Sequence, residues 1–151
     1  MNLKWNVMLS DYNKETGISH ITIATDLGIF EGVSRLHEED KDIESIFQGC
    51  RYAEMRAVLK YLKLKLKILE SKISGLSNYY NNIKQMRCFN EEEKQTRFLK
   101  REIDKYIKEY TELDRMINNL KDGLYSEMIH YREDKEHFYD KINKKSEPTE
   151  E

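Results

Sequence analysis

Apolar residues recur every three or four positions through most of the chain after residue 52, and this spacing constrains the fold more than any other feature. Heptad spacing sustained over about four repeats is typical of coiled-coil helices. The first series comprises Tyr52, Met55, Leu59, Leu62, Leu66, Leu69, Ile73, Leu76, Tyr80 and Ile83. The second comprises Leu99, Ile103, Tyr106, Tyr110, Leu113, Ile117, Leu120 and Leu124, and continues less regularly to Phe138.

The two series are separated by one obvious break, at residues 86–90. Asn90 followed by three glutamates is typical of a helix N-cap with acidic residues in the first turn. The pattern therefore predicts helices at about residues 49–86 and 90–138. Since the connection between them is short, they should fold back on each other as a long antiparallel two-helix coiled coil.

The N-terminal part has a different pattern, typical of strands. Residues 3–9 and 18–25 alternate and are rich in β-formers, with turn-forming residues at 11–17 between them. A second turn at residues 26–28 leads into a third strand, in which Gly32 marks either a bulge or a close backbone approach. We expect an α+β fold with a three-stranded antiparallel β-meander and acidic connector at 1–48, the helical hairpin at 49–143, and a disordered tail at 144–151.

The composition predicts a thin molecule that associates with itself. Of 151 residues, 38% are hydrophobic and 36% are charged, too few apolar residues for a thick core. Each predicted helix also carries apolar residues off its main stripe, which self-association would bury. These are Tyr61, Leu64, Ile68, Tyr79, Phe98 and Ile107. We expect a homo-oligomer, at least a dimer; the alternative is a monomer in which Lys and Glu stems cover this surface.

Charge and cysteine content suggest a cytoplasmic protein. Cys50 and Cys88 are too few and too far apart for a disulfide framework, and no signal peptide or membrane span is evident. Residues 1–49 carry four basic and nine acidic side chains, whereas residues 50–151 carry twenty-two and nineteen. An anionic ligand should therefore bind the second part, although the net charge of −2 argues against nucleic acid.

Catalytic and metal-binding patterns are missing from the sequence. Nucleophile-elbow, P-loop, dinucleotide-binding and zinc-protease motifs are all absent, and the four histidines lack ligand spacing with the cysteines. We therefore expect a protein that is not an enzyme and that uses neither a metal nor a cofactor.

The stretch from 28 to 57 is the most distinctive part of the chain. It combines a strand with F-x-G, a His-x-x-Asp element, a spacer and G-x-x-x-A-x-x-R-A. The residues of this pattern are Phe30, Gly32, His37, Asp40, Gly49, Ala53, Arg56 and Ala57. The stretch resembles small proteins of phages that infect Firmicutes, among them the type-one Thoeris anti-defence proteins. The resemblance implies a sponge in the host cytoplasm that binds a cyclic ADP-ribose-type messenger without cleaving it.

A phosphate-bearing nucleotide needs cationic donors for its anions and flat side chains for its base. Arginines near the start of the first predicted helix and around the turn between the helices supply the cations, and two nearby aromatic residues supply the stacking surface. Asn90 either reads a base edge or caps the second helix. The candidate binding residues are Arg56, Arg51, Tyr80, Phe89, Asn90, Arg97 and Arg101.

Other interpretations of the same residues stay open. Each arginine can simply lie on a solvated helix face, and Arg56 can pair with an acidic residue of the 38–44 segment. In a dimer, the interhelical turn of one chain can meet the start of the first helix of its neighbour and complete a pocket. For the whole protein, the alternative function is a coiled-coil protein–protein interaction module, either an inhibitor or an assembly adaptor.

Overall fold

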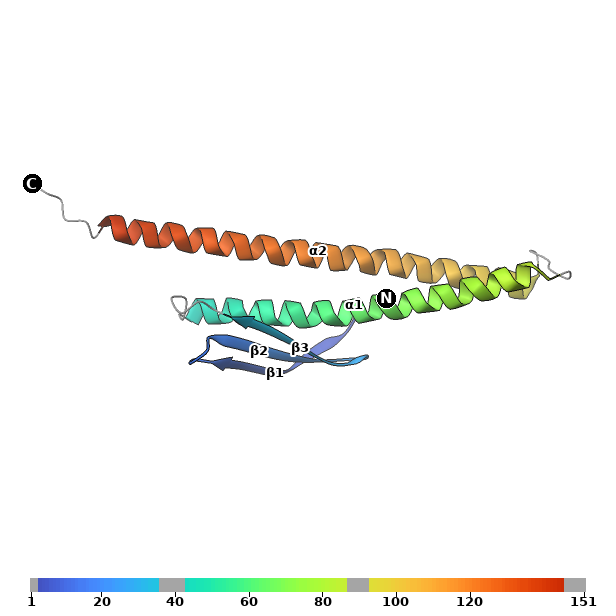
Figure 1. Ribbon diagram of the computed structural model, residues 1–151, viewed down its shortest axis with the longest axis horizontal. Coiled ribbons are helices and arrows are strands. Elements are labelled where there is room, and N and C mark those ends of the chain that lie inside the picture. Colours follow the sequence, from blue (N-terminus) through green and yellow to red (C-terminus); the bar gives the residue numbers. More distant parts are fainter. Residues whose placement is uncertain (1–2, 36–42, 87–92, 146–151) are drawn as a thin grey trace, which may run out of the picture.

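The fold in the computed structural model is α+β, as the sequence predicts. The structure describes residues 3–35, 43–86 and 93–145, and the side chains of residues 3–35, 46–86 and 93–124. Three strands, β1 (Trp5–Asn13), β2 (Ile18–Thr25) and β3 (Gly28–Arg35), precede two helices, α1 (Ile43–Lys84) and α2 (Lys94–Lys145). The molecule is elongated, with the sheet on one side of α1 and α2 on the other (Figure 1).

The sheet is an antiparallel meander in the order β1-β2-β3, which confirms the predicted topology. The first turn depends on Asn13, whose Oδ1 accepts hydrogen bonds from the amides of Glu15 at 2.9 Å and Thr16 at 3.3 Å. Gly17 follows with a φ of 69°, which glycine adopts without steric cost, and its N–H donates to the Asn13 carbonyl. This turn chemistry fixes the register of the hairpin.

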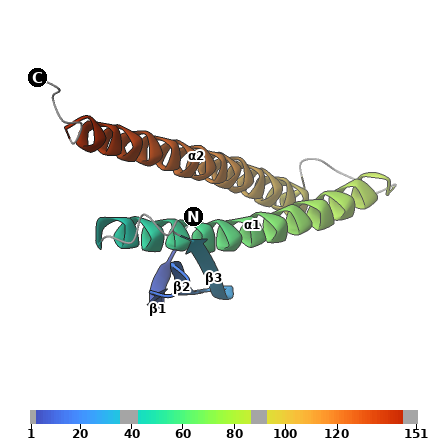
Figure 2. The same cartoon turned by 60° about the vertical axis from the view of Figure 1, so that its left-hand side comes forward.

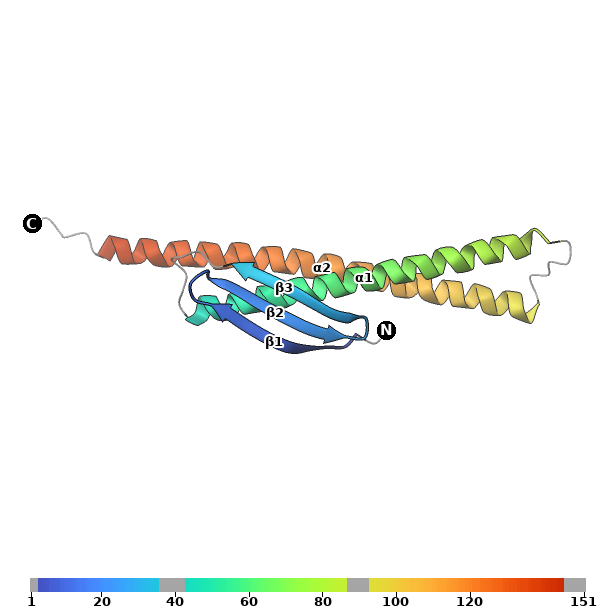
Figure 3. The ribbon, with the colours of Figure 1, turned by 60° about the horizontal axis from the view of Figure 1, so that its bottom comes forward.

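The core lies where β2 and β3 pack across the first half of α1 (Figure 3). Alternate residues of β2 point to the helix, so Ser19, Ile21 and Ile23 are buried while their neighbours are partly exposed. Seven residues of α1 are buried between the sheet and α2. They are Tyr52, Ala53, Ala57, Val58, Leu59, Tyr61 and Leu62.

Gly32 is the point of closest approach between β3 and α1. A Cβ added at Gly32 would lie 1.7 Å from the carbonyl oxygen of Ala53 and 2.7 Å from the amide nitrogen of Ala57. Of the two predicted roles for this glycine, the close backbone approach is therefore confirmed and the bulge is wrong. The bulge lies instead in β1, where the register shifts between Val7 and Leu9.

The apolar residues most buried between the two helices lie near the middle of the hairpin, and the contact continues toward the interhelical connection, where Thr96 is buried and Lys72 lies over the Tyr106 ring. Those near the middle are Leu69 of α1 and three residues of α2, Leu113, Ile117 and Leu124. Farther toward the interhelical connection the apolar stripe is only partly buried, for example at Leu76 and Ile103. The antiparallel hairpin is thus present, whereas continuous coiled-coil packing stays a prediction.

The helix boundaries differ from those predicted. The first helix begins at Ile43 rather than near residue 49, and Glu44 in its first turn is compatible with a helix start. The second begins at Lys94, so no glutamate occupies its first turn, and the expected N-cap Asn90 lies outside the described residues. It continues to Lys145, into the segment expected to be a disordered tail, and residues 146–151 are not described.

Tyr61 corrects part of the argument for self-association. Its side chain is off the helical stripe, as expected, but the sheet covers it and leaves it 0% exposed. The other off-stripe residues are at least partly exposed, including Tyr79 and Phe98 in the half of the hairpin that has no sheet. No helix in the described part of the chain is long and apolar enough to cross a membrane.

Candidate functional site

The distinctive 28–57 pattern corresponds to the crossing of β3 over α1. The small side chains of Ala53 and Ala57 are fully buried and leave room for the backbone at Gly32. Beside them, the ring of Phe30 packs on Tyr61 with centroids 5.8 Å apart. Gly49 is also buried in α1, while His37 and Asp40 lie outside the described residues. The described members of the pattern therefore build the fold at one place.

Arg56 belongs to the same crossing and binds the main chain of β3. Its Nη1 donates a 2.7 Å hydrogen bond to the carbonyl of Val33, and one helical turn later Lys60 Nζ donates a bond of the same length to the carbonyl of Glu31. These two carbonyls lie on the outer edge of the sheet, beyond which the described part of the chain has no strand. Arg56 thus locks the sheet onto the helix, through a main-chain oxygen rather than through an acidic side chain.

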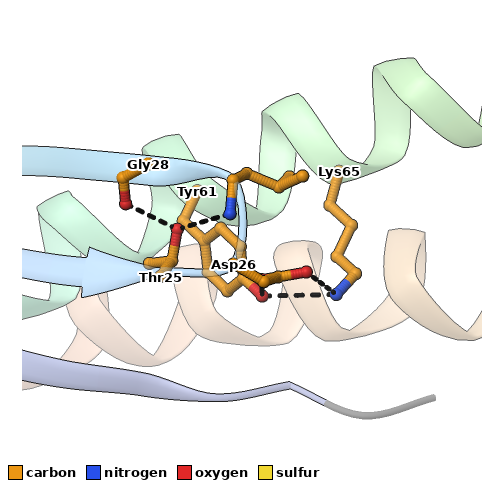
Figure 4. A network of polar contacts seen from close by, with 6 residues as sticks. Thr25, Asp26, Gly28, Tyr61 and Lys65 are labelled. Carbon is orange, nitrogen blue, oxygen red and sulfur yellow. Dashed lines mark hydrogen bonds and ion pairs between the residues drawn. The ribbon is translucent and has the colours of Figure 1, made fainter.

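A second polar network joins the β2–β3 turn to α1 (Figure 4). The hydroxyl of Tyr61 donates a hydrogen bond to Asp26 Oδ1, while Lys65 Nζ lies 3.3 Å from Asp26 Oδ2 and 3.2 Å from the Tyr61 oxygen. Thr25 Oγ1 holds the turn itself, accepting from the Leu27 amide and donating to the Gly28 carbonyl. Gly28 has a φ of 122°, which favours glycine at this position.

The network changes the acid–base properties of its three members. The hydrogen bond from Tyr61 lowers the pKa of the Asp26 carboxyl, and Lys65 adds to this effect. Burial, followed by the bond to Asp26, raises the pKa of the Tyr61 hydroxyl. Burial opposes the charge of Lys65, but its contacts with Tyr61 and Asp26 outweigh burial and raise the pKa of the ammonium. Near neutral pH the three side chains have their ordinary charges. The network then serves as a contact between the β2–β3 turn and α1.

The predicted binding residues do not meet in one chain. Because α1 begins at Ile43, Arg51 and Arg56 lie in its third and fourth turns rather than at its start, whereas Tyr80 lies near its end, about 36 Å from Arg56 at 1.5 Å per residue. Arg97 and Arg101 are exposed at the start of α2, at the same end of the molecule as Tyr80 (Figure 1).

The remaining two candidates, Phe89 and Asn90, lie outside the described residues. A site that uses both groups of arginines would therefore require a second chain.

Positive charge collects around the second group. The part of the hairpin beyond the sheet, residues 66–86 and 93–108, carries nine basic and four acidic side chains. We call this part the distal arm. Lys72 and Lys105 lie 5.6 and 6.0 Å from the ring centre of Tyr106, so cations and an aromatic face already occur together there. Such a surface attracts anions.

An apolar groove lies in the other half of the molecule, and the sequence patterns did not reveal it. Its volume is about 440 Å³. It is formed where the N-terminal segment, α1 and α2 meet, and it is lined by Leu3, Trp5, Glu54, Met55, Val58, Leu62, Met116, Asn119 and Leu120. The sequence signal that could have revealed it is Trp5, a large aromatic residue in the first strand. Two methionines give the groove an adaptable lining.

Metal and thiol chemistry find no support in the described residues. No group of three potential metal ligands occurs among them. Cys50 is a free, partly buried thiol in α1, and Cys88 lies outside the described part of the chain.

Comparison of the chain with known protein families, with curated proteins and with solved structures found no match.

Proposed function

We propose that this protein is a non-enzymatic binding protein of phage type, which sequesters a cyclic nucleotide or cyclic ADP-ribose-type messenger and so evades a host immune signal. One observation carries the proposal. Residues 28–57 resemble the anti-defence pattern, and the described members Phe30, Gly32, Ala53, Arg56 and Ala57 form one packed crossing. A pattern whose members meet in space is more specific than one scattered along a sequence.

The charge distribution supports the same proposal. A cyclic nucleotide carries phosphates, and the distal arm offers an excess of exposed cations beside the aromatic side chains of Tyr79, Tyr80 and Phe98. Arginine binds phosphate through paired N–H donors, which makes Arg97 and Arg101 the first residues to test. Arg56 is less suitable, since one of its nitrogens already binds β3.

Thermal shift and calorimetry with a panel of cyclic dinucleotides and cyclic ADP-ribose isomers test the proposal. A true ligand at 100 times its dissociation constant should stabilise the fold by about 2.7 kcal/mol. It should also be recovered chemically unchanged after the complex is denatured. If every member of the panel leaves the melting temperature unaltered, or if the ligand is cleaved, the sponge proposal fails.

Paired variants locate the site. Replacing Arg97 and Arg101 with Gln should weaken binding by more than tenfold, because each loses a charge-assisted contact of about 1.5–3 kcal/mol. Arg115→Gln is the matched control, an exposed arginine of α2 outside the distal arm. Equal affinity in both variants would show that the phosphates bind elsewhere.

A second candidate function, a protein–protein interaction module, is favoured by a separate observation. Trp5, Val7, Met8 and Leu9 of β1 are all exposed, and Trp5 also lines the apolar groove. Exposed apolar side chains on a terminal strand are typical of a surface that binds another chain. Native mass spectrometry distinguishes the two functions, since a sponge captures the small ligand and an adaptor does not.

A further inference from the structure

The two edges of the sheet differ in what covers them. At the β3 edge, Arg56 and Lys60 bind the outward carbonyls of Val33 and Glu31. At the other edge, no strand among the described residues lies beyond β1, and all residues of β1 except Tyr12 are exposed. Only one of the nine residues of β1 is charged, so it lacks the lysines that commonly protect such an edge.

The register shows which main-chain groups of β1 point outward. Antiparallel pairs alternate between hydrogen-bonded and non-hydrogen-bonded, and the groups of one residue point to the same side. The main-chain groups of Glu31 and Val33 point away from β2. Those of their partners on β2, Thr22 and His20, therefore point toward β1. Following the β1–β2 register across the bulge then leaves a set of outward residues. These are Trp5, Val7, Ser10 and Tyr12.

A twofold rotation can place this set of outward residues opposite the same set in a second copy. We propose that β1 pairs antiparallel with β1 of a second copy, about an axis between Met8 and Leu9, to form a continuous six-stranded sheet. In this register Trp5 lies opposite Tyr12 of the partner subunit, and Val7 lies opposite Ser10 of the partner subunit. Every outward residue of β1 therefore meets an outward residue. The bulge at Met8 lies at the axis, where the two copies are equivalent.

The side chains fit the same register. Lys4 and Asp11 are both exposed and, by alternation along the strand, lie on the sheet face turned away from α1. The pairing places Lys4 diagonally across from Asp11 of the partner subunit, within reach of a long side chain. This charge pair occurs twice in the dimer and no like charges face each other. Next to the axis, Met8 and Leu9 lose their exposure to water.

Two matched valines test the interface. Val7 and Val33 are 47% and 44% exposed on the first and last strand of the sheet, but only Val7 lies on the proposed interface. Wild-type protein and Val33→Lys should sediment as dimers at micromolar concentration, and Val7→Lys as a monomer of 18.2 kDa with unchanged helix content by circular dichroism. A monomeric wild type, or a Val7→Lys variant that stays dimeric, would overturn the proposal.

Cysteine cross-linking tests the register, and it is informative even if Val7→Lys fails to fold. In a Cys50→Ser, Cys88→Ser background, Leu9→Cys places two thiols beside the axis, whereas Asn13→Cys places them about 30 Å apart at 3.4 Å per residue. Mild oxidation should link Leu9→Cys chains into covalent dimers and leave Asn13→Cys chains unlinked. Equal linking of both variants, or linking of neither, contradicts the twofold pairing. The edge of β1 would then pair with a strand of another protein.

Discussion

The apolar stripe of α1 is buried in different ways in the two halves of the helix. The first half is covered on two sides, by the sheet and by α2, and its Ala53, Ala57 and Tyr61 are fully buried. Among the described elements, only α2 lies beside the second half (Figure 2). Its stripe residues Ile73 and Leu76 stay partly exposed. Two helices alone bury the stripe between them, whereas the sheet covers a further face of the first half.

The largest loss of stability is expected from a change in the half of α1 that the sheet covers. Gly32→Val should destabilise the protein by more than about 4 kcal/mol, because a Cβ at this position overlaps the Ala53 carbonyl and the backbone must move apart. Chemical denaturation measures the loss. A variant that unfolds at the same denaturant concentration as wild type would show that β3 does not cross α1 at Gly32.

Alanine substitutions should differ between the two halves of the hairpin. Leu113→Ala removes a fully buried side chain at the helix contact and should cost about 2–4 kcal/mol. Leu76→Ala, in the half without the sheet, should cost less than about 1.5 kcal/mol, because the residue is already partly exposed. Similar losses in urea unfolding would mean that the distal arm is as well packed as the rest, as in a continuous coiled coil.

Arg56→Ala should lower stability by about 1–2 kcal/mol, because the Val33 carbonyl loses a charged donor that is itself partly exposed. Arg51→Ala is the comparison, since Arg51 lies in the preceding turn of α1 but is exposed. If Arg56→Ala leaves the melting temperature unchanged and weakens nucleotide binding, Arg56 contributes to the ligand site instead.

The Asp26 network should make the contact between the turn and α1 sensitive to acid. A folded-state pKa below the ordinary 3.8 means that the contribution of Asp26 is complete above that value and is lost as the pH falls through the lowered one. Since Asp26 is largely exposed, the effect should be below about 1 kcal/mol. Asp26→Asn should therefore be less stable than wild type at pH 7, and the difference should vanish at low pH. A constant difference would exclude titration of this carboxyl.

The smallest change in stability is expected in the distal arm. Gly75→Ala should be neutral or stabilising by up to about 1 kcal/mol, because nothing lies within 4 Å of an added Cβ and alanine favours the helix. Thermal unfolding measures the change. Clear destabilisation would reveal a close helix crossing at Gly75.

Much of this architecture was predictable from sequence because it depends on local periodicity. The heptad series predicted both helices, alternation predicted the strands, and Gly32 in a strand predicted either a bulge or a close approach. The start of α1 was missed, since an acidic segment is compatible with both a loop and a first helical turn. Tyr61 was misjudged because the partner that buries it, the β2–β3 turn, is distant in sequence.

The candidate site was harder to predict than the fold. Spacing along a helix shows which residues share a face, but not which end of a long hairpin they reach. Arg56 and Arg97 were therefore both predicted as phosphate ligands, although one binds a strand and the other is exposed on the distal arm. The apolar groove needs three segments that are far apart in the chain, so no local pattern marks it.

The dependence of β3 on α1 has a consequence for the order in which the chain folds during synthesis. The strands emerge from the ribosome first, yet an isolated three-stranded meander is only marginally stable. Its buried face needs Ala53 and Ala57, and its outer carbonyls need Arg56 and Lys60. The first thirty-five residues therefore cannot reach their final form until about five turns of α1 have followed them. Until that part of α1 has been synthesised, the β1 edge of the N-terminal part stays open to other strands.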